Sequence, residues 1–297
     1  MMIGVDWGSS GFRAYLLHDD GRIAETRSAA CGITTLRQAD YPAVLQREIG
    51  DWLQDDGNRP ILLSGMVGSR QGWREAAYVE CPAGLADLPR HLCPVGIDGE
   101  RQALIVPGLV CRTAAGLPDV MRGEETQIFG IVEAGETASL CLPGTHSKHV
   151  AVEAGRITGF ATAMTGEVFA LLRRHGLLAA MLPPDAAGFD PAAFRSGVAR
   201  SGDSGGLLHH FFGVRTRRLF DELAAAAALD YLSGIMIGHE IRGTTWTGSV
   251  RIVGAHDLSE RYRLAFECLG IAASVVPEHA AAQGLHRIGR LLAGGRP

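Results

Sequence analysis

The sequence predicts an α/β protein of two domains that are built on the same plan. Residues 2–63 show the pattern of three short strands, a helix and a buried strand. A similar order of strand, glycine-rich turn, returning strand and third strand recurs at residues 138–162. In addition, 297 residues exceed the usual size of a single domain.

The composition is that of an ordinary globular protein, with 46% apolar and 20% charged residues. A net charge of −4 gives no electrostatic footprint for nucleic acid or an acidic membrane surface, and no run of eighteen apolar residues occurs. The six cysteines are scattered without zinc spacing and are interpreted as buried hydrophobic residues. We therefore expect a cytoplasmic protein with small-molecule ligands and neither nucleic acid nor membrane as a partner. The oligomeric state is left open, with a homodimer among the options.

The first turn lies between predicted strands at residues 2–6 and 12–17 and contains Gly8, Ser9 and Ser10. Glycine leaves backbone N–H groups uncovered and the serines add hydroxyl donors, so this turn can hold phosphate oxygens. Asp6 ends the preceding strand and offers a hard oxygen ligand for Mg²⁺. A plain hairpin with one exposed aspartate is the alternative for this stretch alone.

A helix is predicted at residues 41–53 from its apolar spacing, with residues 55–58 as its end and a buried strand at 60–63. The next loop follows a strand end, where α/β proteins collect ligands. In it, Arg70 offers a fork for an anionic group and Trp73 a flat apolar face, with Ser69 beside them. The alternative is a glycine-rich surface loop.

Residues 80–118 are rich in proline and glycine, and we expect irregular structure there around one strand near 103–106. A helix then opens with Glu124 and Glu125 after Gly123. Acidic residues in a first turn suit the helix dipole, but either carboxylate could also serve as the base for a substrate hydroxyl. Consecutive helix residues point about 100° apart, so the two cannot face the same atom.

The second turn follows the predicted strand 138–142 and consists of Gly144, Thr145, His146, Ser147 and Lys148, after which come two more strands at 149–152 and 157–162. Two such turns facing each other would grip one polyphosphate from both sides. The internal repetition favours this interpretation over two chance glycine turns.

Helices are predicted at 168–175, 191–201 and 219–242, with loops at 183–189 and 202–206. A strand at 249–253 then leads through Gly254 and Ala255 into a helix at 258–269, followed by a last strand at 274–276 and a last helix at 278–292. The strand–glycine–helix element could receive a nucleoside, or it could be a plain βα unit.

Several stretches resemble the 2-dehydro-3-deoxygalactonokinase family, and they are spread over nearly the whole chain. They are IGVDWGSSGFR (3–13), GMVGSRQGW (65–73), MRGEETQ (121–127), LPGTHSKH (142–149), MTGE (164–167) and RYRLA (261–265). The resemblance implies two RNase H-like domains of the actin/hexokinase/heat-shock-chaperone ATPase superfamily around a central nucleotide and substrate cleft. It places the domains at 1–135 and 136–297, with the final helix returning to the hinge.

The same resemblance implies that ATP and Mg²⁺ are used to phosphorylate the 6-hydroxyl of 2-dehydro-3-deoxy-D-galactonate in D-galactonate catabolism. Asp6 would organise the metal, and Glu124 or Glu125 would be the base. The related sugar kinases usually have an aspartate there that often follows a glycine, which favours Glu124. The ATP-binding residues would be Gly8, Ser9, Ser10, Arg13, Gly144, Thr145, His146, Ser147, Lys148, Gly254 and Ala255, and the residues for the sugar acid Ser69, Arg70, Trp73 and Arg122.

Two other functions fit the same residues. One is a kinase for another sugar or sugar acid, because a fold does not fix the acceptor. The other is a non-catalytic ATP-binding clamp or regulator, which would close on nucleotide without transferring phosphate.

Overall fold

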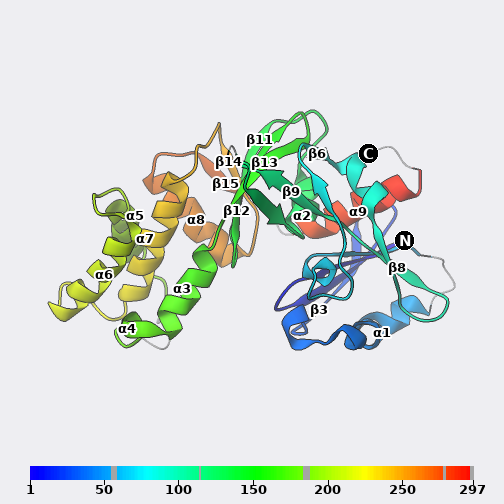
Figure 1. Cartoon of the computed structure of the whole chain (residues 1–297), viewed down its shortest axis with the longest axis horizontal. Helices are drawn as coiled ribbons and strands as arrows, with labels where there is room; N and C mark the ends of the chain where they lie inside the picture. The colour runs from blue at the N-terminus through cyan, green and yellow to red at the C-terminus, as the bar shows by residue number, and fades with distance from the viewer. Residues whose placement is uncertain (55–58, 114, 183–187, 277–278, 295–297) are drawn as a thin grey trace. The chain divides into compact units, whose positions relative to one another are not determined.

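The computed structural model describes residues 1–54, 59–113, 115–182, 188–276 and 279–294 (Figure 1). Two compact units make up the chain. Unit 1 contains Met1–Thr137, Val150–Phe160 and His279–Pro297, and unit 2 contains Ala138–His149 and Ala161–Glu278. The predicted α/β class is confirmed. A division at residue 135 gives the second domain both Val150–Phe160 and the last helix, whereas here these segments belong to unit 1.

The main sheet of unit 1 has six strands in the order β3-β2-β1-β4-β8-β7. β1 pairs antiparallel with β2 and parallel with β4, so that Asp6 lies opposite Arg13 on one side and Ser64 on the other. The strands are β1 (Met2–Trp7), β2 (Phe12–Leu17), β3 (Ile23–Ala29), β4 (Ile61–Ser64), β7 (Cys93–Gly96) and β8 (Gln102–Ile105).

Alternation along β1 directs its side chains to two layers. Val5 and Trp7 belong to a core cluster with residues of helix α1 (Tyr41–Leu53). Gly4 faces helix α9 (Ala280–Leu292), where a Cβ atom would lie 2.9 Å from Leu285 Cδ1. The sheet is therefore covered on both faces, and the carboxyl end of β1 is held in place.

A second, three-stranded sheet of unit 1 has the order β10-β9-β5. Its strands are β5 (Tyr78–Glu80), β9 (Gly108–Arg112) and β10 (Pro118–Met121), and β6 (Ala83–Gly84) pairs with the start of β13 (Arg156–Ala163). The strand expected near 103–106 is present as β8, but the expectation of irregular structure around it was wrong, because strands of two to five residues are too short to show a clear alternation. Among the described residues, this unit also contains four 3₁₀ helices, at Ile33–Thr35, Gln38–Asp40, Met66–Gly68 and Leu85–His91.

Helix α2 (Glu124–Ile131) packs on α9 with direct backbone contact. A Cβ atom at Gly130 would lie 2.0 Å from Ala280 O, and one at Gly284 would lie 1.8 Å from Thr126 O. Only glycine fits at these two positions. The close contact between α2 and α9 fixes the first turn of α2, which carries Glu124 and Glu125.

In unit 2, the strands β15 (Ala273–Val275), β14 (Val250–Ile252) and β11 (Ala138–Leu142) are parallel neighbours in this order. The chain then enters β12 (Ser147–Glu153), whose first three residues belong to this unit. The helices are α3 (Thr165–Arg174), α4 (Gly176–Ala179), α5 (Pro191–Arg200), α6 (Gly206–Leu219), α7 (Ala228–Arg242) and α8 (His256–Cys268). Figure 1 shows α5 and α6 beside α7, whose residues are almost all buried.

One predicted helix of unit 2 was wrong. Residues 219–242 do not form a single helix, because α6 ends at Leu219 and Asp221 adopts a left-handed conformation with φ +57°. The alanines at 224–227 favour a helix by propensity, but α7 begins only at Ala228. α6 itself escaped prediction because it exposes Leu208 and Phe212 while burying His210, which blurs its apolar stripe.

The expected helix end at 55–58 and residues 183–187 of the expected loop 183–189 lie outside the described residues. Within the part of the chain that the structure describes, no helix combines the length and the apolar character needed to cross a membrane.

Candidate active site

The first turn is closed by backbone hydrogen bonds. Gly8 N donates to Gly11 O at 2.9 Å. The sequence suggested that this N–H group is open to a ligand, but it is already hydrogen-bonded within the turn. From the next segment, Ile33 N donates to Gly8 O at 3.1 Å and Thr34 Oγ1 donates to Ser9 O at 2.8 Å. These contacts fix the turn from behind, while the side chains of Ser9 and Ser10 remain exposed.

The glycines of this turn are not required by its own packing. A Cβ atom at Gly8 would come no closer than 3.8 Å to Gly11 O, and one at Gly11 would lie 4.0 Å from Ala29 O. By contrast, a Cβ atom at Gly32 would lie 2.2 Å from Ser9 O. Space above Gly8 and Gly11 is what a phosphate group needs to approach the backbone. An open hollow of ≈ 510 Å³ lies here, lined among others by Asp6 and Arg13.

Asp6 is half-buried at the end of β1. Burial raises the pKa of its carboxyl to about 6, with Arg13 acting in the opposite direction and the charge of Glu124 raising the pKa further. Gly65 after β4 has φ +92°, and a Cβ atom there would lie 3.2 Å from Asp6 Oδ1. The loop after β4 and the first turn of α2 therefore both meet the end of β1, because Gly123 approaches Gly65 closely as well.

Glu124 and Glu125 have different surroundings. Glu125 is fully buried, accepts hydrogen bonds from Gly123 N at 2.7 Å and Thr126 Oγ1 at 2.9 Å, and burial raises its pKa to about 7. Glu124 is half-buried, and its Oε2 accepts from Arg122 N at 3.0 Å. The charge of Glu124 raises the pKa of both Asp6 and Glu125.

The loop after β4 separates the predicted residues for the sugar acid. Trp73 is 8% exposed and stacks on Tyr41 with 5.8 Å between ring centroids, so its ring is occupied by core packing and does not lie open to a ligand. Arg70 is exposed, with Glu75 as a loose partner at 3.4 Å. Ser69 Oγ is buried and makes no hydrogen bond within the described residues.

Arg122 lies beneath this loop. Its Nη2 donates to Ala76 O at 2.7 Å, and its guanidinium lies 4.2 Å from the centroid of the Tyr78 ring. Nε and Nη1 are buried without a hydrogen-bond partner among the described residues, and Nη1 lies 3.0 Å from the place of a Cβ atom on Gly68. Arg122 thus ties the loop to the start of α2.

The second turn, in unit 2, is supported by helix α3. Glu167 N donates to Thr145 O at 3.0 Å, and the Glu167 carboxylate pairs with His146 Nε2 at 2.5 Å. A Cβ atom at Gly166 would lie 2.3 Å from Gly144 O, which shows how closely α3 approaches. Gly144 itself has room for a Cβ atom, as Gly8 does. Lys148 is buried, and its Nζ donates to His146 O at 3.2 Å.

A cavity of ≈ 180 Å³ in unit 2 begins at Gly144. Its walls come from α3, α7 and α8 and include Phe169, Met236, Arg261 and Tyr262. Gly254 and Ala255, which the sequence suggested for the nucleoside, stand just before α8 and are not among the lining residues. The sequence did not indicate that α7 lines this cavity, because its residues indicate only a buried apolar helix. RYRLA at 261–265 was the one available signal.

The chain is similar over nearly its whole length to kinases of one sugar acid. The profile of the family described as 2-keto-3-deoxy-galactonokinase matches residues 6–288. A protein of Rhizobium meliloti named as a probable 2-dehydro-3-deoxygalactonokinase is 37% identical, with 97% of this chain and 96% of the relative covered. The 2-dehydro-3-deoxygalactonokinase of Escherichia coli is 33% identical, with 98% of both chains covered.

Solved structures agree with this similarity. A crystal structure from Sinorhizobium meliloti, described provisionally as a 2-dehydro-3-deoxygalactonokinase, has a TM-score of 0.89 at 36% identity and covers 98% of this chain and 99% of its own. Component A of the (R)-2-hydroxyglutaryl-CoA dehydratase of Acidaminococcus fermentans has a TM-score of 0.52 at 14% identity, with 97% and 96% covered. That second likeness is one of fold alone.

Proposed function

The chain belongs to the 2-keto-3-deoxy-galactonokinase family, and on that premise we propose that it transfers the terminal phosphoryl group of ATP to the 6-hydroxyl of 2-dehydro-3-deoxy-D-galactonate. The protein is a kinase of a sugar acid, and ATP is its phosphoryl donor. "2-Keto" and "2-dehydro" name the same ketone. The reaction is a step in the breakdown of D-galactonate.

Asp6 on β1 and Glu124 on α2 are the two carboxylates from which we assign the catalytic roles. Burial disfavours the ionised form of Asp6, and the negative charge of Glu124 adds to this cost. Hard carboxylate oxygens in such an arrangement fit Mg²⁺, and we assign the metal to Asp6. When bound, the ion neutralises charge on the phosphates during transfer. The exposed serines and open glycines of the first turn, together with Arg13, would bind phosphate oxygens.

Glu124 is the proposed base. It would accept the proton of the acceptor hydroxyl as that oxygen bonds to phosphorus and the bond from phosphorus to ADP breaks. Glu125 is less suited, because both of its oxygens are engaged and its side chain is fully buried. Its role is to hold the first turn of α2 by accepting from Gly123 N.

The nucleoside of ATP is assigned to the cavity of unit 2. Its walls are largely apolar side chains, as a purine base requires, and Gly144 of the second turn forms one edge. Gly254 would approach from the start of α8, since a Cβ atom there would lie 3.3 Å from Pro143 O, next to the second turn. Thr145, His146 and the backbone of the turn would then lie near the phosphates.

Arg70 is the proposed partner of the acceptor carboxylate. Its guanidinium is exposed and only loosely paired, so its planar fork is available for two carboxylate oxygens. Ser69 stands next to it, and Arg122 would support both residues by tying down the loop.

Release of ADP tests the proposed reaction. The wild-type protein should release ADP only when both 2-dehydro-3-deoxygalactonate and ATP are present. Asp6→Asn should lower kcat by orders of magnitude while the far-ultraviolet circular dichroism is retained, because charge neutralisation at the phosphates is lost. Asp20→Asn, in the exposed hairpin after β2, is the matched control. ADP release without the sugar acid would instead support a clamp.

Exchange of each glutamate for glutamine separates the two candidates for the base. Glu124→Gln should cut kcat by about 10²–10⁴, the usual contribution of a positioned base, with the Kd of ATP little changed. Glu125→Gln keeps the acceptor for Gly123 N and should be mild. The opposite order would move the base to Glu125, and a loss below about tenfold in both variants would remove α2 from this role.

The assignment of Arg70 is tested by a substitution that keeps the charge. Arg70→Lys loses the fork and should raise the KM of the sugar acid more than that of ATP. Arg74→Lys is a matched control, since Arg74 is exposed in the same loop and donates to Pro94 O. An equal rise of both KM values would place the carboxylate elsewhere, with Arg13 and Arg122 as the next candidates.

A further inference from the structure

A chain of buried hydrogen bonds runs beneath the second turn. Thr244 Oγ1 lies 2.6 Å from His149 Nδ1, and His149 Nε2 lies 2.7 Å from Glu240 Oε1. The other carboxylate oxygen accepts from Tyr262 OH at 2.7 Å, and that phenol oxygen lies 2.8 Å from Ser147 Oγ. All five residues belong to unit 2, and Glu240 lies at the middle of the chain.

The number of available protons sets the direction of each bond. Tyr262 donates its hydroxyl hydrogen bond to Glu240, so Ser147 must be the donor in its hydrogen bond with the phenol oxygen. On the other side, His149 donates from Nε2 to Glu240, and its Nδ1 accepts from Thr244 when the ring is neutral. Glu240 therefore accepts from both directions, and every member of the chain is satisfied.

The direction of these bonds changes the role of Ser147. Its side chain is fully buried and its proton is used by Tyr262, so the hydroxyl cannot donate to a phosphate. Ser147 is the first residue of β12 and follows directly on Gly144, Thr145 and His146. Its bond to Tyr262 therefore anchors the end of the second turn to helix α8.

The surroundings argue against a metal at this place. Cys141, His149 and Glu240 offer ligand atoms within 4.8 Å of one another. However, both nitrogens of His149 are already hydrogen-bonded, as are both oxygens of Glu240. Burial raises the pKa of the Cys141 thiol well above its ordinary value, which disfavours the thiolate that a metal would need.

Tyr262 is also a wall of the ≈ 180 Å³ cavity that begins at Gly144. We propose that Tyr262 is a positioning residue that ties the nucleoside cavity to the second phosphate turn through its hydrogen bond to Ser147. Its ring borders the nucleoside, while its hydroxyl fixes the turn that receives the phosphates. The inference rests on the proposed function, which assigns the phosphates to the second turn and the nucleoside to this cavity.

Tyr262→Phe tests this link because it keeps the ring and removes only the hydroxyl. Ser147 then loses its acceptor and Glu240 loses one donor, so the turn is less well fixed. We expect the Kd of ATP and of ADP to rise about tenfold, which is within the usual contribution of one buried hydrogen bond, here the bond between Ser147 and the phenol that holds the turn. The Kd of adenosine should stay within about twofold, because adenosine carries no phosphate for the turn to hold. A mere defect of the cavity wall would weaken adenosine as well.

Two further variants isolate the contact. Ser147→Ala removes the same bond from the other end, so it should weaken ATP as Tyr262→Phe does, and the double variant should be no weaker than either single one. Ser139→Ala is the matched control: Ser139 is also buried in unit 2, but its hydroxyl bonds to Thr247 O, away from the turn. That variant should bind ATP and adenosine as the wild type does.

The outcomes separate the inference from its premise. Unchanged ATP binding in Tyr262→Phe, with wild-type kinase activity, would overturn the positioning role and leave the proposed function intact. Equal weakening of ATP and adenosine would also overturn it, as would additive effects in the double variant. If the wild-type protein binds ATP no more tightly than adenosine, the premise itself fails. A stoichiometric metal ion at Cys141, detected by elemental analysis of the wild type but lost in Cys141→Ala, would replace the hydrogen-bonded chain by a metal site.

Discussion

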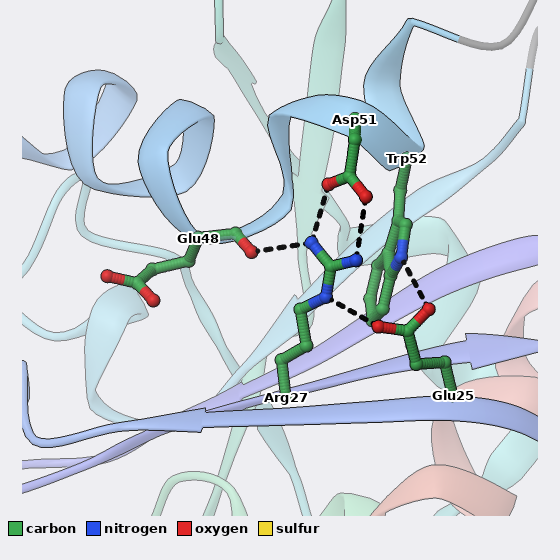
Figure 2. A network of polar contacts seen from close by, with 5 residues as sticks. All are labelled: Glu25, Arg27, Glu48, Asp51 and Trp52. Carbon is green, nitrogen blue, oxygen red and sulfur yellow. Dashed lines mark hydrogen bonds and ion pairs between the residues drawn. The ribbon is translucent and has the colours of Figure 1, made fainter.

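Each unit contains a polar network built around one charged side chain, and the two networks differ in depth. In unit 1, the guanidinium of Arg27 on β3 holds both oxygens of Asp51, Glu25 Oε1 and Glu48 O, and lies 4.3 Å from the centroid of the Trp52 ring (Figure 2). In unit 2, the carboxylate of Glu240 on α7 accepts from His149 and Tyr262.

The two networks differ in how far their side chains are exposed to solvent. The side chains of Glu25 and Asp51 are 49% and 64% exposed, whereas those of His149 and Glu240 are 5% and 2% exposed. Water can replace the partners of Arg27, so each loss there is partly compensated. The partners of Glu240 are almost fully buried, so a group left alone there bears most of its desolvation cost. Burial, more than charge, therefore determines how much each network contributes to stability.

The largest effect is expected from Glu240→Ala. It leaves His149 Nε2 and the Tyr262 hydroxyl without their acceptor in a dry interior and opens a cavity. We expect the free energy of unfolding of unit 2 to fall by about 3–5 kcal/mol, as for one partner removed from a buried pair. Urea denaturation followed by Trp246 fluorescence measures it, with Trp7, Trp52 and Trp73 replaced by Phe in both proteins compared, since Trp246 is the one tryptophan of unit 2. A loss below 1 kcal/mol would remove the distinction between the two networks.

Glu240→Gln should be milder, by about 1–2 kcal/mol, and it sharpens the comparison. The amide oxygen can still accept from Tyr262, and the amide nitrogen can donate to His149 if the ring moves its proton to Nδ1. The Thr244 hydroxyl would then accept a hydrogen bond from His149 Nδ1 instead of donating one to it. The ring tautomer is therefore the measured quantity: nitrogen-15 chemical shifts should show His149 protonated at Nε2 in the wild type and at Nδ1 in the variant. A wild-type His149 protonated at Nδ1 would contradict the proton count.

The two networks also differ in what the sequence could reveal. Local patterns predicted the first turn with Asp6, the second turn from Gly144 to Lys148, and the helix opening with Glu124, because each is a short run with its own chemistry. Glu240 and Tyr262 could not be found in this way. They lie more than 90 positions beyond the turn that they support, and α7 reads as a buried apolar helix. Only the fold brings them together.

Trp73 gives the converse lesson. A tryptophan in a glycine-rich loop at a strand end suggests a ligand platform, but its ring stacks on Tyr41 of α1. The free energy of burying a large aromatic ring decides its place, and no local pattern shows which core it will join. The segments Val150–Phe160 and His279–Pro297 are a similar case at the scale of the chain, because sequence order alone cannot show that they pack with unit 1.

A smaller effect is expected from Arg27→Met in unit 1. The variant keeps most of the apolar stem and loses the ion pairs, so the free energy of unfolding should fall by only about 1 kcal/mol. Urea denaturation at 0.05 and 0.5 M NaCl checks the cause: the difference from the wild type should shrink at high salt, since exposed ion pairs are screened. Arg47→Met serves as the control, because Arg47 is exposed and its partner Glu48 is its sequence neighbour. A loss as large as that of Glu240→Ala would show that depth is not the deciding property.

The smallest effect concerns the pH dependence contributed by Asp51. Its hydrogen bonds to Arg27 lower the pKa of the carboxyl from 3.8 to about 2. A lowered pKa in the folded state means that the stabilisation is fully present above about pH 4 and is lost as the pH falls toward 2. The wild type should therefore be slightly more stable than Asp51→Asn at neutral pH, and the two stabilities should converge between pH 4 and pH 2. In the Arg27→Met background the cation is gone, so Asp51→Asn should no longer change the pH dependence. A persistent difference there would mean that Asp51 acts through another contact, such as the end of α1, and not through Arg27.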